Sequence, residues 1–267
     1  MDLLETVDER GVAILTLNRP HRRNAFNRAL ILDLTSSLKR LDADASVRVV
    51  ALTGACGNFC AGGDIEWMRS LAKASPQAQE EQALELSKMF HTLDRLSKPT
   101  IAAVEGAAYG GGVGLVACCD VAISNNRSKF AMSEVRLGLA PAVVGPYLVR
   151  AIGARASRAL FLTAEPIGAD RALQIGLVHE LAPEGEIDAA RDRIIEALLL
   201  GAPGAQAKAK GLVELCERRP IDVSLSKEMA RLILARWASS EGAEGLSSFL
   251  ERRAPNWRPR RKASDVS

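Results

Sequence analysis

Apolar and polar positions along the first 130 residues alternate between the two-residue period of strands and the wider spacing of helix faces. Two short apolar runs at 3–7 and 12–17 flank the turn-like residues 8–11 and predict a β-hairpin. Apolar residues then recur at helical spacing over 29–41, and the β-branched run 47–53 is typical of a buried strand. The same pattern predicts helices at 65–71, at 83–96 and through Cys118, and strands at 100–104, 120–124 and 129–132.

Beyond Pro141 the strand pattern fades, apart from a run at 177–181, and helical spacing takes over. Helices are predicted at 143–152, 156–162, 169–174, 187–200, 205–216, 223–238 and 241–252. Strands that alternate with helices and then give way to helices alone indicate an α/β protein. We expect an α/β core over residues 1–200 and a C-terminal helical region over residues 201–267, with no linker between them.

The composition is that of a globular protein. A chain of 267 residues, 48% of them hydrophobic and 25% charged, can bury a substantial core. No apolar stretch reaches the roughly 18 residues that a membrane span needs, and the acidic start over residues 1–10 does not resemble a signal peptide. We therefore expect a cytoplasmic protein with no membrane contact.

Cysteine and histidine give no pattern of a disulfide framework or of a metal centre. The five cysteines are an odd number in a long chain, and Cys56 and Cys60 have no second Cys or His pair to complete a zinc site. The three histidines, His21, His91 and His179, lie far apart in the sequence. No metal site is expected.

The net charge of +3 is concentrated at the C-terminus. Residues 258–267 hold four basic residues against one acidic residue, so the rest of the chain is neutral. A neutral body argues against a nucleic-acid-binding face on the domain, which makes nucleic acid an unexpected partner. The basic tail leaves open a contact with RNA or phosphate, although a solvated chain end is the favoured explanation.

Two glycine-rich loops occupy equivalent places in the predicted fold. Each one leaves a buried strand and enters a helix, the first over 54–63 and the second over 106–114. Such a loop presents free backbone N–H groups beside the positive end of a helix. Two loops on neighbouring strands could aim one N–H each at the same carbonyl oxygen, which is the geometry of an oxyanion hole. Glycines that merely allow close packing are the simpler alternative.

Several other interpretations of these glycines fail against the sequence. A dinucleotide fingerprint that starts at Gly110 requires a third glycine where Leu115 stands. The chain contains no Gly-Lys-Ser/Thr of a phosphate-binding loop, no Gly-x-Ser-x-Gly elbow and no His-Glu-x-x-His. Nucleotide-binding, serine hydrolase and zinc protease functions are therefore not indicated.

A series of short motifs, each weak alone, becomes specific in its order along the chain. The motifs are Asn18-Arg19-Pro20-xxx-Asn24-Ala25, Ala51-Leu52-Thr53-Gly54, Phe59-Cys60-Ala61-Gly62-Gly63-Asp64, Lys98-Pro99-Thr100-Ile101-Ala102-Ala103-Val104, Gly110-Gly111-Gly112, Ala117-xx-Asp120, Lys129-Phe130, Glu134-Val135-xx-Gly138, Ala172-xxx-Gly176-Leu177-Val178 and Glu244-Gly245-xxx-Phe249. Together they resemble the crotonase, or enoyl-CoA hydratase/isomerase, superfamily over nearly the whole chain. The resemblance implies a spiral of ββα turns whose C-terminal helices assemble homotrimers, usually paired into hexamers.

The resemblance also implies the residues of an acyl-CoA site. The N–H groups of Gly63 and Gly111 would bind the thioester oxygen, and Glu134 would move the proton. Coenzyme A, as part of the substrate and not as a cofactor, would lie along Arg22, Arg23, Asn24, Ala61, Asp64 and Ile65. Phe249 and Trp257 resemble residues that cover coenzyme A from the C-terminal region, and plain packing of the last helix explains them equally.

One glutamate of the family pattern is missing. Hydratases of this family commonly carry a second glutamate at the position of Gly114. Two carboxylates can divide the work between water and C2, whereas Glu134 alone must do both jobs or shuttle a proton along the substrate. A single glutamate also occurs in the enoyl-CoA isomerases of the family. A non-catalytic or RNA-binding homologue is a further alternative.

The segments 112–120 and 133–147 look most like the methylglutaconyl-CoA hydratase branch and its isoprenoid-degrading relatives. Substrates of that branch carry a distal carboxylate, which an arginine would bind. Arg69, Arg127 and Arg136 are the candidates. The sequence therefore predicts a lyase that hydrates a 2-enoyl-CoA, with 3-methylglutaconyl-CoA as the candidate that the resemblance implies, and favours this over the isomerase.

Overall fold

A six-stranded sheet forms the centre of the computed structural model, which describes residues 1–217 and 219–258. The order across the sheet is β1 (Leu3–Val7), β2 (Val12–Leu17), β3 (Val49–Gly54), β4 (Thr100–Val104), β6 (Val121–Asn125) and β9 (Glu180–Ala182). β1 is antiparallel to β2, and the other neighbours are parallel. A smaller sheet joins β5 (Ala107–Tyr109), β7 (Lys129–Ala131) and β8 (Ile167–Gly168).

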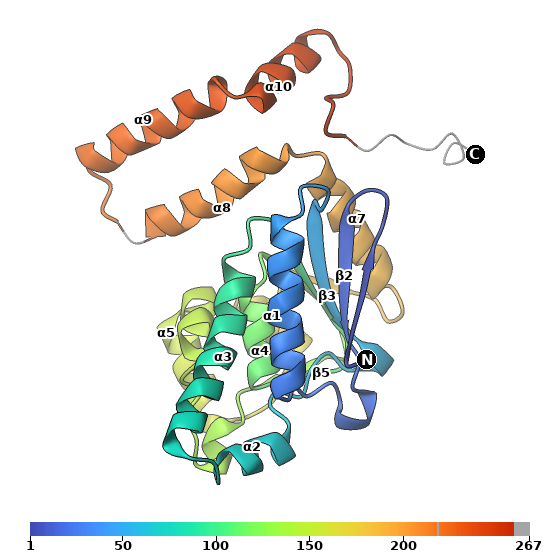
Figure 1. Cartoon of the computed structure of the whole chain (residues 1–267), viewed down its shortest axis with the longest axis vertical. Helices are drawn as coiled ribbons and strands as arrows, with labels where there is room; N and C mark the ends of the chain where they lie inside the picture. The colour runs from blue at the N-terminus through green and yellow to red at the C-terminus, as the bar shows by residue number, and fades with distance from the viewer. Residues whose placement is uncertain (218, 259–267) are drawn as a thin grey trace.

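Helices cover the sheet and then extend beyond it (Figure 1). They are α1 (Arg28–Ala43), α2 (Ile65–Leu71), α3 (Pro76–Asp94), α4 (Gly111–Cys118), α5 (Gly145–Thr163), α6 (Ala169–Gln174), α7 (Ile187–Leu199), α8 (Pro203–Glu217), α9 (Val223–Trp237) and α10 (Ser240–Leu250). Short 3₁₀ turns occur at η1 (Pro20–Arg22), η2 (Ala55–Gly57) and η3 (Glu134–Leu137). The predicted α/β core with a helical C-terminal region is confirmed.

Alternation along the strands sends side chains into two different cores. Leu15 and Leu17 of β2 lie in the larger core, together with the apolar face of α1. Val12 of the same strand belongs to a second cluster, against Ile195 and Leu199 of α7. β4 is buried along its whole length, because helices cover both faces of the parallel part of the sheet.

Some predicted elements differ from the structure in their bounds. α3 begins at Pro76 rather than at residue 83, because the hydroxyl of Ser75 accepts a hydrogen bond from the N–H of Ala78 and caps the helix. The two helices predicted at 143–152 and 156–162 share the label α5, and the backbone is non-helical at Gly153, where φ is +75°, so the predicted interruption is confirmed. The second glycine-rich loop contains the strand β5, which pairs with β7.

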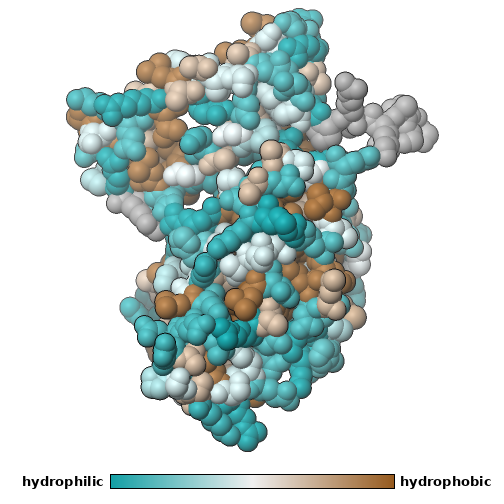
Figure 2. All heavy atoms as spheres, in the orientation of Figure 1, coloured by the Kyte–Doolittle hydropathy of each residue, from teal (hydrophilic) through white to brown (hydrophobic). Residues whose placement is uncertain are grey.

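The C-terminal helices lie at one end of the molecule. In Figure 1, α8 crosses the upper end of the core, and α9 and α10 follow above it. Large apolar side chains of this region are exposed, among them Trp237, Leu246, Phe249 and Leu250, and Figure 2 shows apolar residues over the same helices. The predicted boundary between residues 200 and 201 falls between α7 and α8, and the division into two regions stays a prediction.

Among the helices that the structure describes, none combines the length and the apolar character that a membrane crossing requires.

Candidate active site

The two glycine-rich loops meet at one edge of the main sheet. β3 and β4 are parallel neighbours, so the chain leaves both strands at the same edge. There Cys60 of the first loop pairs with β5 of the second: its N–H donates to the oxygen of Ala107 at 2.9 Å, and its oxygen accepts from the N–H of Tyr109 at 2.9 Å. This pairing places Gly62 and Gly63 beside Gly110 and Gly111.

The loops approach so closely that side chains would not fit between them. A Cβ atom on Gly62 would lie 2.7 Å from the oxygen of Tyr109 and 3.4 Å from the nitrogen of Gly111. Gly62 and Gly110 also have positive φ angles of +87° and +50°, which L-residues rarely adopt. The backbone conformation therefore favours glycine at both positions, and at Gly62 the contact between the loops requires it as well.

Two backbone N–H groups at this contact are free. Phe26 pairs with the first loop by donating to the oxygen of Gly62 and accepting from the N–H of Asp64, an arrangement that turns the N–H of Gly63 away from Phe26. Gly111 is the first residue of α4, where backbone N–H groups have no partner within the helix. Over residues 1–217 and 219–258, neither Gly63 nor Gly111 donates its N–H to another protein group.

Glu134 lies beside these glycines. β7 runs parallel to β5, and the N–H of Gly110 donates to the oxygen of Ala131 at 2.8 Å, which brings the first residue of η3 next to the second loop. A Cβ atom on Gly110 would lie 3.0 Å from Oε1 of Glu134. The other carboxyl oxygen, Oε2, is buried and has no hydrogen-bond partner among the described residues.

The environment of Glu134 changes its acidity. Burial of the carboxyl group raises its pKa above the ordinary value, and a hydrogen bond from its own backbone N–H offsets only part of this effect. A carboxyl group with a raised pKa and an unpartnered oxygen can accept a proton and return it. The group is therefore suited to proton transfer beside the two free N–H groups.

The position of the missing glutamate is filled by apolar side chains. Gly114 is buried on α4, and a Cβ atom there would lie 2.5 Å from Cγ1 of Val144 and 2.9 Å from Cε1 of Phe90. Carbon atoms in contact lie about 3.5–4.0 Å apart. No second carboxylate fits at this position unless its neighbours move.

The predicted coenzyme A residues of the N-terminal half lie together, but the side chains of three of them already have partners within the chain. The oxygen of Arg23 accepts from the N–H of Ala61 at 3.0 Å, which joins the turn at 22–24 to the first glycine loop. Arg22 and Arg23 are exposed, and Arg22 forms an ion pair with Glu66 at 2.8 Å. Ile65 is exposed on α2.

Asn24 and Asp64 instead have structural contacts. The amide of Asn24 is fully buried and donates to the oxygens of Ala55 and Asn58 at 2.9 and 2.6 Å. Asp64 caps α2 and forms an ion pair with the buried Arg19 at 2.9 Å. Burial would raise the pKa of Asp64, but hydrogen bonds from the N–H of Glu66 and from Arg19 outweigh burial and lower it. Only the backbone of these two residues remains open to a ligand.

Phe249 and Trp257 do not join the other predicted site residues within this chain. Phe249 lies on α10, at the end of the molecule opposite α2 and the glycine loops (Figure 1). The indole N–H of Trp257 donates to the oxygen of Leu200 at 3.1 Å, and Arg48 donates to the oxygen of Trp257 at 2.7 Å. The basic residues Arg260, Arg261 and Lys262 of the tail lie outside the described residues.

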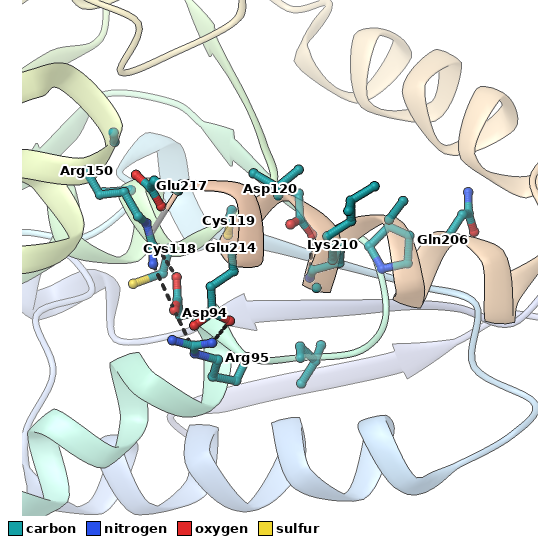
Figure 3. Close-up of a pocket in the computed structure, with 18 of the residues that line it drawn as sticks. Asp94, Arg95, Cys118, Cys119, Asp120, Arg150, Gln206, Lys210, Glu214 and Glu217 are labelled. Atoms are coloured by element: carbon teal, nitrogen blue, oxygen red, sulfur yellow. Dashed lines mark hydrogen bonds and ion pairs between the residues drawn. The ribbon is translucent and has the colours of Figure 1, made fainter. Parts of the chain in front are cut away.

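A cleft of about 1200 Å³ lies away from this site, between α8 and the strand ends at Pro99 and Asp120. Figure 3 shows its charged side chains paired with one another: Arg95 with Glu214, Arg150 with Asp94, and Lys210 with Asp120. Burial raises the pKa of the Cys119 thiol to about 12, so this thiol is not a ready nucleophile. The cleft is formed at the opposite edge of the sheet from Glu134.

The sequence did not single out the packing around the glycines, namely Phe26, Phe90 and Val144. Among the described residues, no three His, Cys, Asp or Glu side chains gather closely enough to hold a metal ion. The ligands that the site offers to a substrate are therefore backbone N–H groups, one carboxyl group and exposed arginines.

Comparison with known proteins agrees with this arrangement. Residues 8–260 match the family model for enoyl-CoA hydratase/isomerase. A crotonyl-CoA hydratase from Syntrophomonas wolfei is 33% identical over 251 residues, which are 93% of this chain and 95% of that protein. The structure of an enoyl-CoA hydratase from Shewanella pealeana superposes with a TM-score of 0.93 at 38% identity, and covers 96% of both chains.

AtuE from Pseudomonas aeruginosa superposes with a TM-score of 0.92 at 35% identity, over 97% of this chain and 100% of that one. These likenesses extend through the C-terminal helices and confirm the crotonase fold that the sequence motifs implied. The chain belongs to the enoyl-CoA hydratase/isomerase family.

Proposed function

We propose that the protein is an enoyl-CoA hydratase that adds water across the C2=C3 bond of a 2-enoyl-CoA thioester. The observation that carries the proposal is the position of Glu134, whose unpartnered oxygen is buried beside Gly110. The names of its relatives, including the crotonyl-CoA hydratase, support the same activity. The neighbouring N–H groups of Gly63 and Gly111 supply the two donors that such a reaction needs.

In the proposed mechanism, Glu134 acts first as a base and then as an acid. Its carboxylate takes a proton from water while the water oxygen bonds to C3, and the π electrons move through C2 to the thioester oxygen. The N–H groups of Gly63 and Gly111 stabilise the resulting enolate, and loss of one such donor costs about 3–4 kcal/mol in known cases. Glu134 then returns the proton to C2, which completes the 3-hydroxyacyl-CoA.

An enoyl-CoA isomerase is the second candidate. Val144 and Phe90 fill the space at Gly114, so one carboxyl group must perform every proton transfer. In an isomerase, Glu134 would take a proton from C2 of a 3-enoyl-CoA and return it to C4, through the same enolate. The hydratases among its relatives favour the hydratase.

For the acyl group, we propose a branched chain with a distal carboxylate, as in 3-methylglutaconyl-CoA. Of the three candidate arginines, Arg127 already forms an ion pair with Glu184 at 2.7 Å. Arg69 and Arg136 are exposed, and Arg136 shares the short turn η3 with Glu134. Arg136 is therefore the residue that we assign to the distal carboxylate.

We further propose that coenzyme A lies along Arg22, Arg23 and the backbone of residues 61–65. Phe249 and Trp257 lie at the other end of the same chain, so they would cover coenzyme A only in a neighbouring subunit of a homotrimer or hexamer. The exposed apolar side chains of α9 and α10 support such an assembly.

The test is a panel of 2-enoyl-, 3-enoyl- and 3-methylglutaconyl-CoA in deuterated water, followed by mass spectrometry. A hydratase adds the mass of water to 2-enoyl-CoA and places one deuterium at C2. Exchange at C4 of the 3-enoyl-CoA without hydration would instead establish the isomerase. Glu134→Gln should abolish either reaction while acyl-CoA binding persists, and no turnover of any substrate by the wild-type protein would refute both.

A further inference from the structure

We propose that Phe26 is the positioning residue of the two glycine loops: its backbone holds Gly63, and its ring holds Gly111. The inference rests on the proposed function, because it concerns the two N–H groups that we assign to the thioester oxygen. Phe26 itself is buried and offers no polar group to the substrate. Its effect on the reaction would act entirely through the two glycines.

The backbone of Phe26 fixes the first loop. Its N–H donates to the oxygen of Gly62 at 2.8 Å, and its oxygen accepts from the N–H of Asp64 at 2.9 Å. These two bonds form a parallel bridge between Phe26 and Gly63. Since they use the groups on either side of Gly63, they set the direction of its own N–H and leave it free. Any residue other than proline at position 26 has the groups that make these bonds.

The ring of Phe26 fixes the second loop. A Cβ atom on Gly111 would lie 3.0 and 3.2 Å from the two Cε atoms of the ring, and nearer still to Cζ. The tip of the ring therefore fills the space that a side chain at position 111 would occupy. The ring is held in turn by Phe90, which meets it edge-on with centroids 6.3 Å apart. The contact is made by Cζ and the two Cε atoms of the ring, which an alanine side chain lacks.

Backbone hydrogen bonds hold the second loop as far as Gly110, whose N–H donates to the oxygen of Ala131, but the N–H of Gly111 makes no such bond among the described residues, so a side-chain contact at Gly111 matters. Gly110, Gly111 and Gly112 follow one another without side chains, and glycine has the widest range of backbone conformations. Donors stabilise an enolate only if they are fixed before the charge forms. The ring of Phe26 supplies that constraint at the residue whose N–H is used.

The contact makes Phe26 and Gly111 interdependent. Gly111→Ala would drive its methyl group into the ring, and Phe26→Ala would remove the obstacle. Conversely, Phe26→Tyr would add an oxygen at Cζ, the atom nearest to Gly111. The two kinds of change at position 26, one that removes the contact and one that crowds it, should both disturb the position of the Gly111 N–H.

The first experiment measures hydration and binding for Phe26→Leu, Phe26→Ala and Phe26→Tyr. Leu34→Ala serves as the control, since Leu34 is buried in the same core on α1. We expect kcat to fall at least tenfold in Phe26→Ala and in Phe26→Tyr, and less in Phe26→Leu. The Kd of a saturated acyl-CoA should change by less than threefold in each. Leu34→Ala should keep its kcat.

A second measurement reports directly on the hydrogen bonds from the N–H groups of Gly63 and Gly111. The carbonyl stretching frequency of a bound, ¹³C-labelled saturated acyl-CoA falls when two hydrogen bonds polarise the carbonyl. In Phe26→Ala the frequency should move back toward that of free acyl-CoA, and in Leu34→Ala it should not. If every Phe26 variant keeps both the wild-type kcat and the wild-type frequency, Phe26 has no positioning role, although the hydratase function would stand.

The third readout does not depend on turnover. Gly111→Ala should lower the melting temperature, and the double variant Phe26→Ala/Gly111→Ala should melt no lower than Phe26→Ala alone. Strict additivity of the two changes would overturn the proposed contact. If the proposed hydratase function is wrong but the contact is right, the wild-type protein will be inactive and the effects of the two substitutions on the melting temperature will still be non-additive.

Discussion

Substitution of Gly114 tests whether the place of the missing glutamate is filled or open. A methyl group there would lie 2.5 Å from Cγ1 of Val144, so the two carbons overlap by about 1 Å. Overpacking of this kind costs about 1–3 kcal/mol, and the better helix propensity of alanine returns about 1 kcal/mol. Gly114→Ala should therefore lose about 0–2 kcal/mol of unfolding free energy.

Gly114→Glu should be far more damaging. Its longer chain has to displace Phe90 as well, and a buried carboxylate with no partner adds several kcal/mol. We expect a loss of at least about 3 kcal/mol, which corresponds to a fall in melting temperature of roughly 6–12 °C for a chain of this size. The measurements are thermal and urea unfolding, together with the hydration rate.

Val144→Ala supplies the matched background, because it removes the nearest atom. In that background, Gly114→Ala should cost less than it does alone, with a coupling of about 1 kcal/mol. If Gly114→Glu instead melts within 2 °C of the wild type (about 1 kcal/mol or less) and hydrates faster, position 114 opens toward the substrate. The apolar filling described above would then be refuted.

Three further predictions concern the charged groups of the site. Glu134→Gln should lower kcat by a factor of at least about 10³ with little change in acyl-CoA affinity, as measured by steady-state kinetics and calorimetry; an equal loss of affinity would contradict a catalytic role. Because burial raises the pKa of Glu134 and the base must be deprotonated, kcat/KM should fall on acidification at a pH above the ordinary glutamate value. The raised pKa also means that folding favours the protonated form, so stability is lost as pH rises through the pKa of the folded protein, and Glu134→Gln should remove this part of the pH dependence of unfolding. Arg136→Ala should raise KM for 3-methylglutaconyl-CoA about 10-fold or more without a change for crotonyl-CoA, and Arg69→Ala is the control; a uniform effect on both substrates would remove the assignment.

The main sheet was predictable because its signals are local. The hairpin of β1 and β2 and the buried strand β4 have the predicted bounds, since each is short, apolar and limited by turn residues. The start of α3 was missed for the opposite reason. Residues 76–82 contain no large apolar side chain, so the first turns of the helix show no apolar stripe, and only the cap at Ser75 marks them.

The part of the site that backbone groups form, namely the meeting of the two glycine-rich loops, was predictable from the sequence. Parallel strands end at one edge, so the meeting of the two glycine loops followed from their places after β3 and β4. What the sequence did not indicate were contacts between residues far apart in the chain. Phe26 meets Gly111 across 85 positions, and no local pattern distinguishes a ring that holds a loop from one that merely fills the core.

The packing of Phe90 explains why a second glutamate does not fit at position 114. Phe90 lies 2.9 Å from where a Cβ of residue 114 would stand, and it also supports the ring of Phe26. A carboxylate at 114 would displace Phe90, and Phe26 would then lose the neighbour that orients it toward Gly111. In this chain, therefore, a second carboxylate and a firmly held Gly111 compete for the same space. Gly114→Glu should weaken the polarisation of a bound acyl-CoA carbonyl as well as the fold. If the new carboxylate simply added a catalytic group, neither the polarisation nor the stability of the fold would fall.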